Sequence, residues 1–342
     1  MLRKYIRSRV PVRISFGGGG TDVSPYCDVY GGCVINATIN RYVTVTLRPA
    51  GNGEICITSI DYDRTLNYDI DKPLAYDGQL DLIKGVINYM RIEYGLKDGF
   101  ELKVRSDAPP GSGLGSSSAV CVALIGAFKE WLNLPLTPYD IAKLAFKIER
   151  IDLGIKGGRQ DQYAAAFGGF NFMEFYDSRA IVNPLRLREE TIFELEHSLV
   201  LAYIGGSHDS SSILEKQITN VKNKKEDSVE SMHELKRLAI EIKNALVMGD
   251  LKTFGYLLDE SWQNKKRMAD GISNEMIDNV YEIAKANGAL GGKISGAGGG
   301  GFMFFFSDTD KKYELVKALS ENSVQIMNYS FENNGLVTWR VE

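Results

Sequence analysis

The sequence has few cysteine and histidine residues. Among its 342 residues there are four cysteines and three histidines. They are Cys27, Cys33, Cys56, Cys121, His197, His208 and His233. The cysteine spacing fits no zinc-binding pattern, and no two histidines stand at the spacing of a metal-ligand pair. We therefore expect free, buried thiols in a reducing compartment.

Long apolar stretches and large basic blocks are also absent. The longest apolar runs fall far short of the ~20 residues that a membrane-spanning helix needs. Residues 1–9 are basic but contain no apolar signal core. The net charge of −4 makes nucleic acid and anionic membranes poor partners. These features predict a cytoplasmic protein that binds neither nucleic acid nor membrane.

The composition that remains is ordinary for a globular protein, with 44% hydrophobic and 25% charged residues. A chain of this length can form two domains with full cores. Strand patterns dominate the first hundred residues, and Pro184 with a charged run interrupts the pattern near 183–190. We therefore expect one domain over residues 1–185 and another over 186–342. With its inserted helices set aside, the second half reads β-α-β-β-α-β, which is typical of a ferredoxin-like fold.

The most informative stretch is 108–120, Ala-Pro-Pro-Gly-Ser-Gly-Leu-Gly-Ser-Ser-Ser-Ala-Val. A strand over 100–107 runs into it, and a nearly all-apolar helix over 119–128 leaves it. Its glycines allow close approach of a ligand, and the helix start offers hydroxyls and unpaired N–H groups. This is an anion site, and a polyphosphate is its usual occupant. A flexible linker is the alternative, but linkers do not join a strand to a buried helix.

A second glycine run covers 293–301, Lys-Ile-Ser-Gly-Ala-Gly-Gly-Gly-Gly. It satisfies the G-x-G-x-x-G pattern of dinucleotide sites. A dinucleotide site should open a helix, whereas this run lies between two predicted strands. Two interpretations stay open. The run is either a hairpin connection or a backbone that packs closely against a ligand or the first glycine loop.

Two carboxylates, Glu149 and Asp161, flank a glycine-rich turn. Phosphoryl transfer needs a cation across the phosphate oxygens and a group that orients or deprotonates the attacking hydroxyl. Mg²⁺ takes few protein oxygens, besides phosphate and water. The alternatives are a surface ion pair of Glu149 with Lys147 or Arg150, and a helix-capping role for Asp161.

Three stretches resemble motifs of the GHMP kinases. They are Pro-x-x-x-Gly-Leu-Gly-Ser-Ser within 108–120, the run over 293–301, and Pro-Val-Arg-Ile-Ser-Phe-Gly-Gly-Gly-Gly-Thr-Asp over 11–22. The resemblance covers the whole chain in order. It implies an α+β, two-layer fold, with an amino-terminal domain like ribosomal protein S5 domain 2 and a carboxyl-terminal ferredoxin-like domain. It also implies an ATP-dependent kinase that acts on a small molecule.

The resemblance assigns roles to individual residues. The ATP loop is Pro110, Gly111, Ser112, Gly113, Leu114, Gly115, Ser116, Ser117 and Ser118. The glycine motif that faces it is Lys293, Gly296, Ala297, Gly298 and Gly299. Ser117 and Glu149 hold Mg²⁺, with Ser116 and Ser118 as alternative ligands. Asp161 faces the substrate hydroxyl beside Arg13, and the sugar contacts are Gly18, Gly19, Gly20, Thr21 and Asp22. The glycines stand where galactokinases have Gly-Glu-His, and the alternative for Asp22 is a turn or helix-capping role.

Within the family, residues 13–22 and 157–163 resemble the branch that phosphorylates D-glycero-D-manno-heptose 7-phosphate at the anomeric carbon. A substrate that already carries a phosphate needs a second anion site. We expect it to be Lys156 and Arg159, with the strand-to-helix segment that contains Ser207, His208 and Ser210. The expected partners are therefore ATP and a sugar phosphate, and a homodimer is compatible with the sequence. The alternatives are another small-molecule kinase, such as a galactokinase or fucokinase, and a non-catalytic sugar and ATP sensor.

Overall fold

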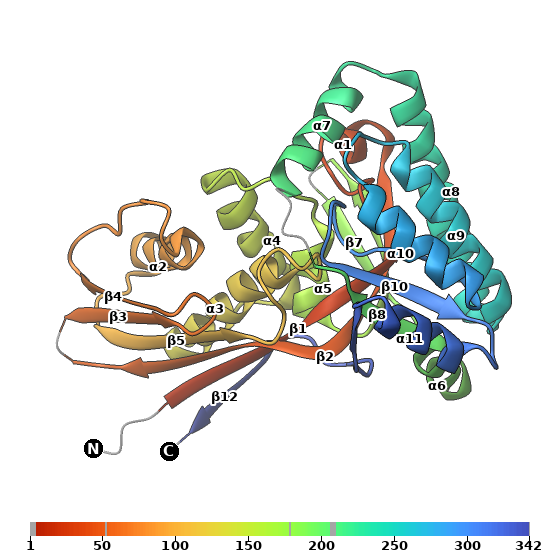
Figure 1. Ribbon diagram of the computed structural model, residues 1–342. Helices are drawn as coiled ribbons and strands as arrows, with labels where there is room; N and C mark the ends of the chain where they lie inside the picture. Colours follow the sequence, from red (N-terminus) through yellow and green to blue (C-terminus); the bar gives the residue numbers. More distant parts are fainter. Residues whose placement is uncertain (1–4, 52, 178, 206–209, 342) are drawn as a thin grey trace.

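The computed structural model describes residues 5–51, 53–177, 179–205 and 210–341, and it contains two β-sheets covered by helices (Figure 1). The first sheet has the strand order β12-β1-β2-β5-β3-β4, and β6 joins it by pairing with β2 and β7. Its strands are β1 (Tyr5–Gly17), β2 (Gly32–Pro49), β3 (Glu54–Ser59), β4 (Arg64–Asp69), β5 (Phe100–Ser106), β6 (Phe170–Tyr176), β7 (Arg179–Pro184) and β12 (Val337–Val341). All neighbouring pairs are antiparallel except β3 and β5.

The helices of the first half pack against this sheet or against one another. They are α1 (Tyr26–Tyr30), α2 (Asp81–Tyr94), α3 (Ser116–Leu132), α4 (Pro138–Phe146) and α5 (Gln160–Phe167). In Figure 1, α2 and α3 lie toward the left, α4 and α5 near the centre, and α1 near the top. α3 is buried along most of its length and packs against β1 and β2. Its apolar sequence therefore forms the core of this half, and the glycine loop before it is held at the edge of that core.

The second sheet has the order β11-β8-β10-β9. Its strands are β8 (Leu199–Tyr203), β9 (Ala289–Ile294), β10 (Phe302–Ser307) and β11 (Gln325–Met327). Its helices are α6 (Glu189–Ser198), α7 (Ser210–Lys222), α8 (Glu226–Met248), α9 (Leu251–Lys266), α10 (Glu275–Ala286) and α11 (Lys312–Glu321). Without the extra helices, this is the ferredoxin-like arrangement that the sequence predicts.

Two features differ from the simple sequence pattern. The last strand, β12, pairs with β1, so the end of the chain returns to the first sheet and crosses the expected division at 185 and 186. α4 continues directly as a π-helix, η1 (Lys147–Asp152), although its apolar spacing is that of one α-helix. A π-helical turn shifts the side chains that follow it relative to an α-helix, and such turns are common at functional sites.

The two sheets are joined by a cluster of aromatic side chains around Phe16. The Phe16 ring lies 5.5 Å from Phe254 of α9 and 5.8 Å from Phe304 of β10, both edge-on. It also lies 6.4 Å from Phe170 of β6. These are favourable geometries for aromatic pairs. The end of β1, which carries the residues just before the first glycines, is therefore fixed against both sheets.

Within the described part of the chain, none of the helices combines the length and the apolarity that crossing a bilayer would require.

Candidate active site

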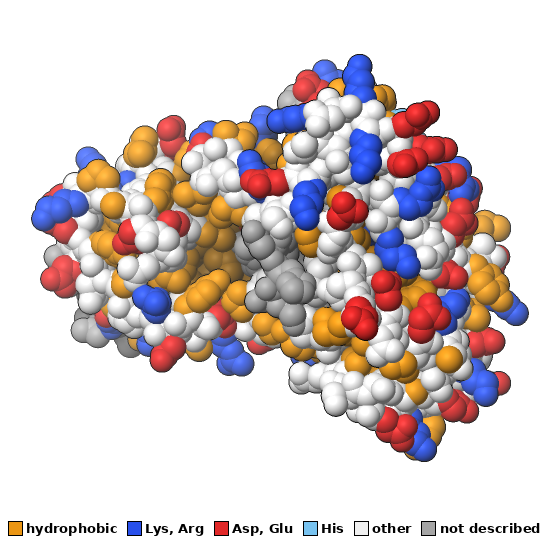
Figure 2. Space-filling model, turned by 45° about the horizontal axis from the view of Figure 1, so that its top comes forward, with side chains coloured by type: hydrophobic (Ala, Val, Ile, Leu, Met, Phe, Trp, Pro, Cys, Tyr) orange, Lys and Arg blue, Asp and Glu red, His pale blue; other side chains and the backbone are white. Residues whose placement is uncertain are grey.

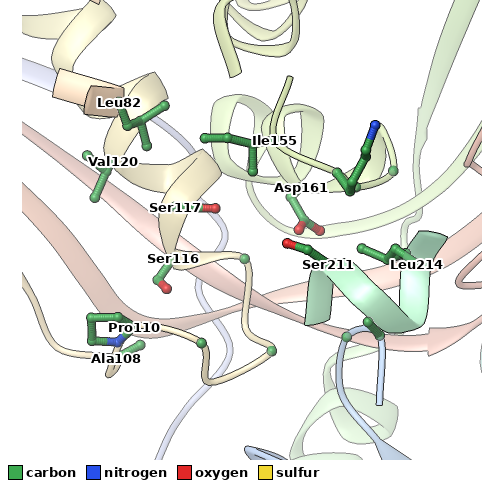
Figure 3. Close-up of a pocket in the computed structure, with 18 of the residues that line it drawn as sticks. Leu82, Ala108, Pro110, Ser116, Ser117, Val120, Ile155, Asp161, Ser211 and Leu214 are labelled. Atoms are coloured by element: carbon green, nitrogen blue, oxygen red, sulfur yellow. The ribbon is translucent and has the colours of Figure 1, made fainter. Parts of the chain in front are cut away.

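A cleft of about 660 Å³ brings together residues from all three glycine segments. Figure 2 shows this face of the molecule hollowed near its centre, with hydrophobic side chains inside the hollow. Figure 3 shows the order of the lining residues: Leu82 and Val120 lie at one end, Ser117 follows, and Asp161 and Ser211 lie beyond it. The cleft therefore has an apolar end and a polar end, with the start of α3 between them.

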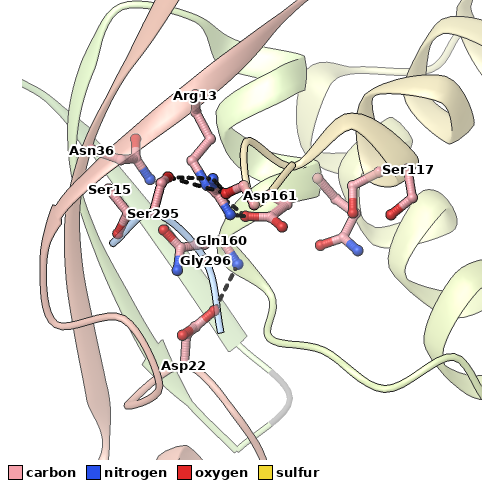
Figure 4. Close-up of polar contacts among 12 residues, drawn as sticks. Arg13, Ser15, Asp22, Asn36, Ser117, Gln160, Asp161, Ser295 and Gly296 are labelled. Carbon is pink, nitrogen blue, oxygen red and sulfur yellow. Dashed lines mark hydrogen bonds and ion pairs between the residues drawn. The ribbon is translucent and has the colours of Figure 1, made fainter. Parts of the chain in front are cut away.

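An ion pair between Arg13 and Asp161 lies in the polar part of the cleft (Figure 4). The Nη2 and Nε atoms of Arg13 are 2.6 and 2.7 Å from Oδ1 of Asp161. The Nη1 atom of Arg13 donates to the carbonyl of Gly113 at 2.5 Å and contacts Oγ of Ser295 at 3.4 Å. One guanidinium therefore joins β1, the loop before α3, the second glycine run and α5.

The two glycine runs pack directly against each other. A Cβ atom on Gly113 would lie 2.2 Å from the carbonyl oxygen of Ser295, and one on Gly296 would lie 2.8 Å from Cα of Gly113. The backbone N–H of Phe302 donates to the carbonyl of Ser112 at 3.1 Å. Glycine is required at this contact because the backbones meet with no room for a side chain. The run over 293–301 is thus more than a hairpin connection.

Glu149 is fully buried, and its neighbours are polar. Its carboxylate accepts hydrogen bonds from the hydroxyls of Ser117 and Ser118 and from the amide of Gln162, each at 2.7 Å. Arg150 Nη1 lies 3.4 Å away. Glu149 is therefore not a surface residue, although it does pair with Arg150. Of the serines, Ser116 and Ser117 line the cleft.

Asp22 is buried and caps the start of α5. Its Oδ2 accepts hydrogen bonds from the backbone N–H groups of Arg159 and Gln160 at 2.9 and 3.0 Å. Its Oδ1 accepts from Gly20 N–H at 3.1 Å. Thr21 is also buried, and its hydroxyl accepts from Cys33 N–H at 3.1 Å. The loop over 18–22 therefore positions the helix that carries Asp161, and Gly19, Gly20 and Asp22 still line the cleft.

The residues expected to bind a second anion do not all lie together. Lys156 is exposed and lines the cleft. The guanidinium of Arg159 instead lies 3.0 Å from Asp28 and lines a separate cavity of about 490 Å³. We therefore assign the Arg159 side chain no contact in the cleft. Ser207 and His208 lie outside the described residues, and Ser210 begins α7 without a described side chain.

Two buried lysines in the cleft wall have no counterpart among the residues expected to bind substrate. Lys265, in the last turn of α9, donates from Nζ to the carbonyl of Gly296 at 2.6 Å. Lys293 donates to the carbonyl of Ser15 at 2.9 Å. Burial lowers the pKa of Lys265 to about 8, with Asp22 raising and Arg13 lowering it. Burial also lowers the pKa of Lys293 well below its usual value, with smaller contributions from Lys265 and Arg13. The sequence does not mark Lys265 as a functional residue, because lysines are common in the last turn of a helix.

Comparison with known proteins identifies two domain families in this chain. Residues 81–169 match the GHMP kinases N terminal domain, and residues 232–325 match the GHMP kinases C terminal domain. The chain is 46% identical over 340 residues to the D-glycero-alpha-D-manno-heptose 7-phosphate kinase of Campylobacter jejuni. That similarity covers 99% of this chain and 100% of the relative.

Solved structures show the same similarity. A D-glycero-D-manno-heptose 1-phosphate kinase from Bacteroides thetaiotaomicron has a TM-score of 0.85 and 39% identity, over 98% of this chain and 99% of that one. The galactokinase of Lactococcus lactis, solved with galactose, has a TM-score of 0.77 over 97% and 95% of the two chains. Its identity is 20%, so it supports the fold alone.

Proposed function

The chain belongs to the GHMP kinases, and we propose that it transfers the γ-phosphoryl group of ATP to the anomeric (C1) hydroxyl of D-glycero-D-manno-heptose 7-phosphate. The product is the 1,7-bisphosphate, a precursor for nucleotide-activated heptose and surface glycans. The observation that carries this proposal is the Arg13–Asp161 pair beside the loop before α3. The full-length similarity to the Campylobacter jejuni enzyme supports the choice of sugar.

ATP fits the cleft as its sequence motif suggests. Gly111, Gly113 and Gly115 have positive φ angles of 74°, 79° and 77°, which glycine adopts without strain. The unpaired N–H groups at the start of α3 and its dipole attract a polyphosphate there. The apolar end of the cleft, near Leu82 and Val120, suits the adenine ring (Figure 3).

Ser117 and Glu149 form a suitable pair of Mg²⁺ ligands. The Ser117 hydroxyl and the Glu149 carboxylate oxygen are 2.7 Å apart. Adjacent ligands in an octahedral magnesium site lie about 2.9 Å apart, and the ion prefers oxygen. Among the described residues no three His, Cys, Asp or Glu side chains form a metal cluster, which agrees with an ion held mainly by phosphate and water. When bound, the ion neutralises charge on the transferring phosphate.

Asp161 receives the proton of the attacking hydroxyl. A bond forms between the sugar O1 and the γ-phosphorus, the bond from that phosphorus to the β,γ-bridging oxygen breaks, and ADP leaves. Arg13 holds the carboxylate of Asp161 in place through two contacts to Oδ1. Because an anomeric hydroxyl is more acidic than other sugar hydroxyls, positioning contributes more than full deprotonation.

Asp161→Asn tests this role. The amide keeps the shape of the carboxylate but cannot take the proton, so we expect turnover to fall ~10²-fold or more while ATP affinity barely changes. Steady-state kinetics and calorimetric titration of ATP measure the two quantities. Asp152→Asn, an exposed carboxylate that pairs with Lys147 outside the cleft, is the matched control. Near-normal turnover in Asp161→Asn would contradict the assignment.

Glu149→Gln tests the metal site. The substitution removes the charge and keeps the size of the side chain, but its amide nitrogen cannot accept hydrogen bonds as a carboxylate oxygen does. The Mg²⁺ concentration at half-maximal rate should rise by ~10-fold or more. Rates measured over a magnesium series give this value. Glu190→Gln on the exposed face of α6 serves as the control, and thermal unfolding shows whether the buried variant folds. If the magnesium series is unchanged, Glu149 has only a structural role, as the partner of Arg150, Gln162 and the serines of α3.

The substrate is tested by ADP release from ATP over a panel of acceptors. The panel contains heptose 7-phosphate, heptose 1-phosphate, free heptose, galactose, fucose and mevalonate. We expect the 7-phosphate to have the highest kcat/KM, by ~10-fold or more over the free sugars, because its phosphate adds a charge-assisted contact. Equal rates on phosphorylated and free sugars would contradict the proposed substrate. Sugar binding without ADP release from any acceptor would indicate a sensor.

A further inference from the structure

Three buried cations, Arg13, Lys265 and Lys293, lie beside the acceptor part of the cleft, and in the described part of the chain two of them have no carboxylate partner. Arg13 pairs with Asp161. Lys265 and Lys293 are 3% and 2% exposed, and among the described residues neither has a carboxylate oxygen within 4.0 Å. Lys293 lies 5.6 Å from the ring of Phe304 and donates to a β1 carbonyl, which suits a structural role. Both lysines line the cleft, and Nζ of Lys265 is the one that lies close to Gly19 in the loop over 18–22.

The surroundings of Lys265 are incomplete for an ammonium group. An ammonium has three N–H donors, and the described structure supplies one acceptor, the carbonyl of Gly296 at 2.6 Å. The charged groups that face it are Asp22 on the loop after β1, Arg13 on β1 and Lys293 on β9. Helix α7 contributes Ser211 and Gln217 to the lining of the cleft, and both side chains are neutral. A buried ammonium with so little compensation is costly unless an anion enters its site.

Neutral polar groups beside Lys265 also lack partners. The hydroxyl of Ser15 is buried, has no hydrogen-bond partner within the described structure, and can donate to an anion. The Oε1 atom of Gln160 also lacks a partner there, but it can only accept, so Gln160 could reach an anion only through its Nε2 donor. A Cβ atom on Gly19 would lie 3.5 Å from Ser15 Oγ, 3.6 Å from Gln160 Nε2 and 3.8 Å from Lys265 Nζ. These three side chains therefore converge below the bare backbone of Gly19. The convergence of donors in one wall of the cleft forms a recess suited to an anion.

This recess lies on the acceptor side of Asp161. Gln160 immediately precedes Asp161, and Asp22 and Ser117 lie on opposite sides of Asp161 in Figure 4. The start of α3, where ATP phosphates fit, is on the Ser117 side. Lys265 lies on the Asp22 side, because its Nζ is near Gly19 and Asp22 is one of its charged neighbours. We therefore assign an anion at Lys265 to the acceptor and not to the nucleotide.

We propose that Lys265, assisted by the Ser15 hydroxyl, binds the phosphate that the sugar substrate already carries. This inference rests on the proposed function and names the group that selects a phosphorylated acceptor. In this role Lys265 takes the place that the sequence suggested for Arg159. The guanidinium of Arg159 pairs with Asp28 outside the cleft. Lys265 acts in substrate selection, and Asp161 acts in the transfer itself.

The test is calorimetric binding of heptose 7-phosphate and of ATP, each alone, to the unmodified protein and to Lys265→Met. We expect a 10- to 100-fold loss of affinity for the sugar phosphate, as for a lost charge-assisted bond, and an unchanged affinity for ATP. Lys266→Met is the matched control, since that neighbouring side chain is 31% exposed and lies near Asp278. Unfolding curves and ATP binding show that the variant folds, and Lys265→Gln replaces Lys265→Met if it does not.

Free heptose is the comparison ligand. If Lys265→Met weakens the binding of free heptose and heptose 7-phosphate by the same factor, Lys265 contacts a sugar hydroxyl and the inference is wrong. If only ATP binding weakens, the anion belongs to the nucleotide and the inference is again wrong. Failure of the unmodified protein to turn over heptose 7-phosphate would instead count against the proposed function.

The pH dependence of binding gives an independent readout. A sugar phosphate is a dianion above pH ~6, so it does not titrate at higher pH. Bound phosphate favours the charged lysine, whose pKa in the free protein is about 8. Affinity for heptose 7-phosphate should therefore be constant up to about this pH and fall ~10-fold per unit above it. Lys265→Met and Lys265→Arg should both remove this step, and its persistence in Lys265→Met would assign it to another group such as Lys293.

Discussion

The site depends on the buried contact between Arg13 and Asp161. Arg13 is fixed by β1, where it pairs in register with Thr38 of β2 and donates its backbone N–H to Leu114 at 3.0 Å. Its side chain then reaches Asp161, Gly113 and Ser295, which come from three other parts of the sequence. Removing one partner of such a pair leaves an uncompensated buried charge, which typically costs about 3–5 kcal/mol. The Asp161 carboxylate is therefore held in position by the first sheet, through Arg13.

The glycine segments form one unit around this pair. The loop before α3 and the run over 293–301 touch through their backbones at Gly113 and Gly296. The loop over 18–22 reaches the same unit through Asp22, which caps α5. A nucleotide at the start of α3 and an acceptor near Lys265 would thus lie on two sides of Asp161. In this arrangement, fixed parts of the protein hold a γ-phosphate and a hydroxyl next to each other, and phosphoryl transfer depends on such positioning.

Local patterns were sufficient to predict much of this structure. The strand, glycine loop and apolar helix around 100–132 can be recognised from periodicity, and so can the ferredoxin-like order of the second half. The π-helix η1 could not be predicted, because its apolar spacing resembles that of an α-helix. The return of β12 to β1 and the burial of Lys265 depend on long-range packing. Arg159 has the right charge in the right segment, but its guanidinium is directed to Asp28, which only the folded structure reveals.

The central claim is that the anomeric hydroxyl of the sugar phosphate faces Asp161 while ATP occupies the loop before α3. A crystal structure with a non-hydrolysable ATP analogue and heptose 7-phosphate tests it most directly. The anomeric oxygen is expected within about 3.2 Å of the Asp161 carboxylate and near the γ-phosphorus. A complex in which a different hydroxyl faces Asp161, or in which the sugar lies away from it, would contradict the account.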